Sequence, residues 1–131
     1  MSETTPSTAP KTAIVVLSDP EGGEEALGRL LNALILTGAL RDRDEEVALA
    51  FQGAGSRWPE RAARPDHPAH ALYDAVRDRV SGVSCGCADI FGAAGAEAAG
   101  APLVADLAVP GTRGVQDLSR FLRDGYRLVT F

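Results

Sequence analysis

The chain of 131 residues is 45% hydrophobic and 24% charged, which are the proportions of a soluble globular protein with one domain. Its formal net charge of -5 argues against a broad surface for nucleic acid or anionic lipid, so we expect neither partner. No stretch approaches the ~20 apolar residues that span a bilayer. Residues 1–10 are polar and do not resemble a signal peptide. We therefore predict a disordered tail over residues 1–10, a folded domain over residues 11–131 and a cytoplasmic location.

Short apolar segments alternate with segments of helical periodicity along the domain. The first, over residues 13–17, is apolar on both faces, which is typical of a central strand in a parallel sheet. We expect strands over residues 11–18, 47–51, 80–84, 103–105 and 127–131. Helices are expected from about residue 27 to residue 38, from residues 66–68 onward, over residues 93–100 and around residues 115–122. This alternation predicts an α/β fold, a single-domain flavodoxin-like layered sandwich with a parallel sheet of about five strands.

Polar and reactive residues follow the expected strands. In an open parallel sheet, ligands bind beyond the carboxyl ends of the strands. The residues expected at this edge are Ser18, Asp19, residues 52–58, Cys85, Cys87 and Asp106. The sequence therefore predicts a site formed by several loops that converge on the cysteines.

Both cysteines of the chain, Cys85 and Cys87, lie where the third strand is expected to end and a helix to begin. Unpaired backbone N–H groups and the helix dipole at such a position favour the thiolate, which is the nucleophilic form of cysteine. We expect Cys87 within the first helical turn and Cys85 just before it. Because free cysteine is often buried as a small apolar residue, that role also stays open, above all for Cys85. A disulfide between residues two apart is strained and readily reduced, so a permanent link is not expected.

The run Cys-Ala-Asp-Ile-Phe-Gly at residues 87–92 resembles the Cys-x-Asp-x-x-Gly segment of the DsrE/DsrF-like (YchN-like) sulfur-relay family. Residues 51–58 and 65–70 resemble one branch of that family, and the likeness extends over residues 11–131. Many relatives carry Cys-x-x-Cys, whereas here Ser84 stands at the first cysteine position. The resemblance implies a persulfide-forming Cys87 and assembly into a homo-oligomer, a dimer, trimer or hexamer.

The connection over residues 52–68 is long enough to suggest a functional role. We expect Cys87 and Cys85 to be the catalytic residues. The residues expected to line a pocket beside them are Asp19, Gly53, Gly55, Trp58, His67, His70 and Asp89. Trp58 is expected to fix the connection in place or to fill a subunit contact. Arg57, Arg61 and Arg64 form a basic patch that could hold a thiolate or a sulfur oxyanion.

The two histidines could act with the cysteines in either of two ways. His67 and His70 could complete a zinc site, but the Cys-x-Cys spacing is tighter than zinc sites use, and we predict no metal and no cofactor. A histidine beside the thiol could instead serve as its base or counter-cation.

We predict a sulfur carrier or sulfurtransferase that holds sulfane sulfur on Cys87 and exchanges it with a donor or acceptor protein. Two alternatives remain open at this point. One is a non-catalytic module for a small ligand or for oligomeric interaction, and the other is a thiol–disulfide switch that uses Cys85 and Cys87 together.

Overall fold

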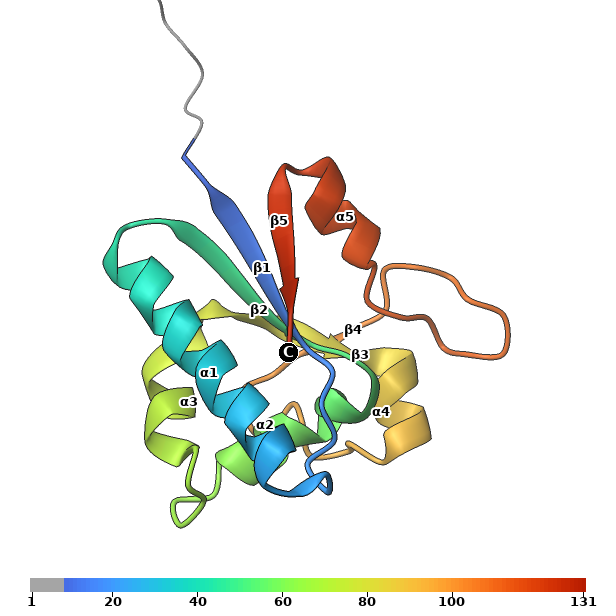
Figure 1. Cartoon of the computed structure of the whole chain (residues 1–131). Helices are drawn as coiled ribbons and strands as arrows, with labels where there is room; N and C mark the ends of the chain where they lie inside the picture. The colour runs from blue at the N-terminus through green and yellow to red at the C-terminus, as the bar shows by residue number, and fades with distance from the viewer. Residues whose placement is uncertain (1–8) are drawn as a thin grey trace, which may run out of the picture.

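The computed structural model describes residues 9–131, so most of the predicted tail, residues 1–8, lies outside the described residues. The chain folds into one sheet with helices around it (Figure 1). The strands are β1 Lys11–Val16, β2 Glu46–Phe51, β3 Val80–Ser84, β4 Leu103–Val104 and β5 Tyr126–Thr130. Their order is β4-β3-β2-β1-β5, and every neighbouring pair is parallel. This confirms the predicted α/β fold, with its flavodoxin-like layered arrangement and five-stranded parallel sheet.

The strand β1 lies inside the sheet and buries both of its faces. Ile14 and Val16 point into the larger core, and Ala13 and Val15 into a smaller core on the opposite face. This two-sided burial explains the unbroken apolar run of the strand, because neither face meets water. The carboxyl edge of the sheet, where β1, β2 and β3 end, is therefore supported by a closely packed central strand.

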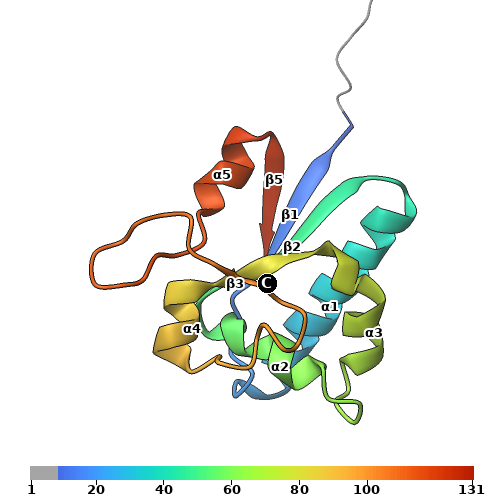
Figure 2. The ribbon, with the colours of Figure 1, turned by 180° about the vertical axis from the view of Figure 1, so that it is seen from behind.

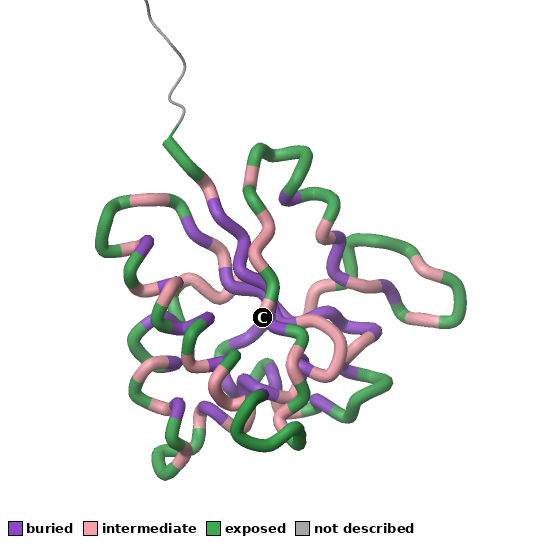
Figure 3. The backbone as a smooth tube through the Cα atoms, viewed as in Figure 1, coloured by how far each residue is buried: buried purple, intermediate pink, exposed green. Residues whose placement is uncertain are grey.

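Helices cover the two faces unequally. The long helix α1 Gly23–Asp42 packs on β1 and β2, and α3 His70–Val76 packs against α1 on the same side. The short helix α5 Leu118–Arg123 lies beside β5 and places Phe121 on the opposite face (Figure 1). Viewed from behind, the segment between β4 and α5 forms a loop that projects from the body of the protein (Figure 2). Much of that loop is exposed, whereas the central strands are buried (Figure 3).

Two segments differ from the sequence-based prediction. Residues 93–100 form turns rather than a helix. Gly92 adopts a left-handed conformation that ends the preceding helix, and Tyr73 Oη donates a 2.7 Å hydrogen bond to the Ala99 carbonyl, which ties the turns to α3. Ala93 and Ala96 are completely buried in these turns. The small residues that suggested close helix packing therefore pack closely as turns.

The connection after β2 is not simply a loop. It contains the 3₁₀ helix η1 Gly53–Arg57 and the short helix α2 Trp58–Ala62, and α3 begins only at His70. A further 3₁₀ turn, η2 Arg77–Arg79, precedes β3. For the other strands and helices, the expected first and last residues differ from the observed ones by a few positions, as is usual when element boundaries are predicted from sequence.

Candidate functional site

The cysteines lie at the carboxyl end of β3, as the sequence predicted. Ser84 keeps an extended backbone (φ -60°, ψ 122°), and the helix α4 Cys85–Phe91 begins at the very next residue. Cys87 is the third residue of this helix and therefore lies in its first turn, as expected. The expectation that Cys85 precedes the helix is wrong by one position, because no loop residue separates the strand from the helix.

The two cysteines differ in how far solvent reaches them. Both are free thiols, but Cys85 is only 6% exposed, whereas Cys87 is half-buried. Residues four apart share one side of a helix, so Cys87 lies on the side of Phe91, which is 38% exposed, and next to it is Ile90, which is 71% exposed. The half-buried thiol of this helix thus lies beside exposed apolar side chains.

The other side of α4 is covered by residues 111–116, which we call the strap. The Gly86 N–H donates a 2.8 Å hydrogen bond to the Gly114 carbonyl, and a Cβ atom at Gly86 would lie 2.9 Å from Val115 Cγ1. Glycine is required there because the strap approaches the helix backbone closely.

Arg113 in the strap forms a bidentate ion pair with Asp89 in α4. Its Nε and Nη2 donate hydrogen bonds of 2.8 Å and 2.7 Å to the two carboxylate oxygens. These hydrogen bonds are the main cause that lowers the pKa of Asp89, and the same pairing raises the pKa of Arg113. An electrostatic interaction with Cys85 is a smaller cause of the raised pKa of Arg113, so the guanidinium lies within electrostatic reach of this thiol. Asp89 is therefore held in place by Arg113, a residue that the sequence patterns did not identify as part of the site.

A buried glutamine anchors the strap at its carboxyl end. Gln116 is 2% exposed, and its backbone N–H donates to Ser84 Oγ at 3.1 Å. Its side-chain Nε2 donates to Gln52 Oε1 at 3.1 Å, and Gln52 Nε2 donates to the Gln116 carbonyl at 3.2 Å. The strap is thus fixed to the ends of both β2 and β3. Asp106, expected at this edge, instead orders the start of α5 by accepting the Asp117 N–H and pairing with Arg120.

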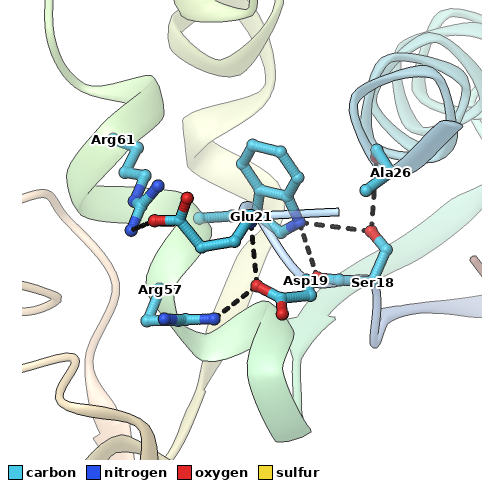
Figure 4. Close-up of polar contacts among 7 residues, drawn as sticks. Ser18, Asp19, Glu21, Ala26, Arg57 and Arg61 are labelled. Atoms are coloured by element: carbon cyan, nitrogen blue, oxygen red, sulfur yellow. Dashed lines mark hydrogen bonds and ion pairs between the residues drawn. The ribbon is translucent and has the colours of Figure 1, made fainter. Parts of the chain in front are cut away.

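The first two loops of the edge are bonded to each other. Trp58 is 2% exposed, and its Nε1 donates to the Ser18 carbonyl at 2.9 Å. Figure 4 shows Arg57 paired with Asp19 and Arg61 paired with Glu21. Two of the three arginines in the expected basic patch are therefore paired with acidic residues of the loop after β1. Trp58 fixes the connection, which was one of its two expected roles.

The two glycines expected in a pocket have backbone roles. Gly55 lies against β1 so closely that a Cβ atom would be 2.2 Å from the Val16 carbonyl oxygen. Gly53 adopts a left-handed conformation (φ 58°) where the chain turns into η1. The 3₁₀ helix η1 in turn packs against α4, so this connection lies beside the cysteines, as the topology predicted.

The histidine contacts found in the structure lie within the same connection. The His67 ring meets the Trp58 ring edge-on at 6.1 Å, and its Nδ1 accepts the Ala69 N–H at 3.0 Å. Burial, with help from Arg64, lowers the pKa of His67, which opposes a role as counter-cation. His70 Nδ1 lies 3.0 Å from the Ala62 carbonyl oxygen. Within residues 9–131, no group of three or more His, Cys, Asp or Glu side chains is placed to hold a metal ion.

The expected pocket residues are spread over several open depressions. Asp19 lines one of about 440 Å³ beside Phe131. Trp58 and His67 line a second of about 420 Å³. Asp89 lines a third of about 260 Å³ together with the strap. None of these three depressions is lined by Cys85 or Cys87.

Comparisons of the chain with protein-family models, with curated proteins and with solved structures find no match. The class that the structure itself defines is a parallel α/β domain with a thiol pair at the carboxyl edge of its sheet. Within residues 9–131, no helix combines the length and apolar character that crossing a bilayer requires.

Proposed function

We propose that this protein carries sulfane sulfur on Cys87 and transfers it to an acceptor thiol. The observation that supports this most is the contrast between the cysteines: a half-buried thiol in the first turn of α4, beside a second thiol that is only 6% exposed. Sulfur transfer needs a reachable thiol and no enclosed pocket, which suits an open sheet edge. The resemblance of residues 87–92 to sulfur-relay proteins favours the same chemistry.

The proposed reaction is two successive displacements at sulfur. The Cys87 thiolate attacks a terminal sulfane sulfur of the donor, the donor S–S bond breaks, and the donor leaves as a thiolate or shortened polysulfide. An acceptor thiolate then attacks the outer sulfur of the Cys87 persulfide, and Cys87 leaves as a thiolate. Each step forms one S–S bond and breaks another, so no external oxidant or reductant is consumed.

The exposed apolar residues beside Cys87 suit a protein as the donor or acceptor. Ile90 and Phe91 form a small apolar surface on α4, next to the thiol. Contact between this surface and a partner would bring the two sulfurs together without a pocket. We also propose a cytoplasmic location, where such thiols stay reduced. We further propose that the protein forms a homo-oligomer. A sedimentation measurement that finds only monomer would contradict this.

Loading with inorganic polysulfide tests the function. The wild-type protein, Cys85→Ser and Cys87→Ser are each treated with polysulfide, desalted and weighed intact. We expect the wild type and Cys85→Ser to gain one sulfur atom and Cys87→Ser to gain none. Loss of two hydrogens from the wild type alone would instead favour a thiol–disulfide switch. No change in any of the three would favour a binding module.

A further inference from the structure

The strap joins a firmly anchored end to a weakly held end. At residues 114–116 it is held by the Gly86–Gly114 backbone bond and by buried Gln116. At Arg113 the strap is held to α4 by the ion pair with Asp89, in which the two side chains are 67% and 42% exposed. Exposed ion pairs are weak and are screened by salt. The Arg113 end can therefore release while the Gln116 end stays in place.

The chain has the geometry that such a movement needs. Gly111 (φ 79°) and Gly114 (φ 108°) flank the Arg113 end in backbone conformations that other residues adopt at a cost. The strap is the later half of the segment between β4 and α5, which projects from the body of the protein in Figures 1 and 2. Backbone hydrogen bonds of 3.0 Å and 2.9 Å between Leu107 and Val115 close this segment at its base, and residues 108–114 beyond that base belong to no strand of the sheet.

The thiol beside this ion pair is Cys85. Asp89 lies four residues after Cys85, so both occupy the same side of α4, and Arg113 pairs with Asp89 on that side. The electrostatic effect of Cys85 on Arg113 agrees with this placement. Cys87 lies on the side of Phe91, away from the strap contact at Gly86. The buried thiol therefore lies on the side of α4 that carries the ion pair, and the half-buried thiol lies on a different side.

We propose that the strap is a latch that controls access to Cys85. While Arg113 is paired with Asp89, a reagent in solution reaches Cys87 and not Cys85. When the pair is released, the Arg113 end lifts and Cys85 becomes a second reactive thiol next to the first. The protein then changes from a single-thiol to a two-thiol surface without refolding, and this property does not depend on which sulfur compound Cys87 handles.

Labelling rates in single-cysteine variants test the latch. Cys87→Ser leaves only Cys85, and Cys85→Ser leaves only Cys87, so a disulfide reagent such as dithiodipyridine reports each thiol separately. In the first background, Arg113→Ala should speed labelling of Cys85 by about tenfold or more, because local opening controls the labelling of a buried thiol. In the second background, the same change should alter labelling of Cys87 by less than about twofold, since that thiol is already reachable.

Three further measurements keep the result specific. Arg29→Ala, which removes the Arg29–Glu25 pair on α1, is the matched control and should leave Cys85 labelling unchanged. Exchange of the charges, Asp89→Arg with Arg113→Asp, should restore slow labelling. In the Cys87→Ser protein with Arg113 intact, raising salt to about 1 M should speed Cys85 labelling, because salt screens the exposed pair. The proposal is overturned if Arg113→Ala leaves Cys85 slow, or if it speeds both thiols equally, which would indicate general loosening.

Discussion

Trp58 Nε1 donates to two oxygens of Ser18, the carbonyl at 2.9 Å and the hydroxyl at 3.2 Å. Ser18 follows β1, and Trp58 begins α2, directly after η1, which packs against α4. One buried side chain therefore connects the end of the central strand to the support of the cysteine helix. The position of α4 depends on a contact between residues forty apart in sequence.

We expect Trp58→Phe to destabilise the protein while keeping the fold. Phenylalanine fills much of the same buried volume but leaves both Ser18 oxygens without the indole N–H. An unmade hydrogen bond of this kind costs about 1–3 kcal/mol. Urea unfolding followed by circular dichroism measures the change. A loss within experimental error would show that the indole contributes packing alone.

Gly55→Ala is expected to be far more damaging than an alanine placed at Gly28. The new Cβ at residue 55 would lie 2.2 Å from the Val16 carbonyl oxygen, whereas nothing lies within 4 Å of a Cβ at residue 28. We expect a loss of about 3 kcal/mol or more for Gly55→Ala, in the range of overpacked sites. Gly28→Ala, inside α1, should gain about 0.5–1 kcal/mol from helix propensity. Thermal or urea unfolding of both variants gives the comparison, and equal effects would contradict the packing described here.

The protein should become less stable as the pH is lowered, because His67 takes up a proton more readily in the unfolded chain. Its pKa in the folded protein lies below the ordinary value of 6.5, so the unfolded chain binds a proton more readily. The free energy of unfolding should therefore decrease as pH falls through 6.5, and this decrease should stop only below the pKa of the folded state. His67→Gln should show a flatter dependence between pH 7.5 and pH 5, whereas parallel curves for the two proteins would refute the assignment.

Rapid thiol labelling near neutral pH should come from Cys87. Cys85 is 6% exposed and Cys87 is half-buried, so a reagent reaches the second thiol first. Cys87→Ser should abolish the fast phase, and Cys85→Ser should keep most of it. The rates are followed by mass spectrometry as a function of pH. Faster labelling of Cys85 would reverse the roles given to the two residues.

Sequence patterns predicted the parts of the protein that depend on local physics. The two-sided apolar run of β1 and the change from β-branched residues to small residues at Ser84 are visible without a structure. From these and the parallel topology, the cysteines could be placed at the carboxyl edge of the sheet.

The strap was not predictable in the same way. Arg113 and Asp89 are separated by more than twenty residues, and no period in the sequence connects them. Gln116 falls inside the helix expected around residues 115–122, and only the fold shows it to be buried against Ser84 and Gln52. Residues 93–100 misled the prediction because alanine favours helices, whereas here the packing of Ala93 and Ala96 and the glycines decide the conformation.

Transfer of isotopically labelled sulfur tests the proposed function most directly. The protein is loaded with polysulfide of heavy-isotope sulfur, desalted and mixed with an excess of an acceptor protein thiol, and both proteins are digested and analysed by mass spectrometry over time. The proposed function predicts label on the peptide of Cys87 at the start and on the acceptor later, with none on Cys85 and no loading of Cys87→Ser. Label that enters through Cys85, or label that stays on Cys87 while the acceptor thiol remains unlabelled, would contradict it.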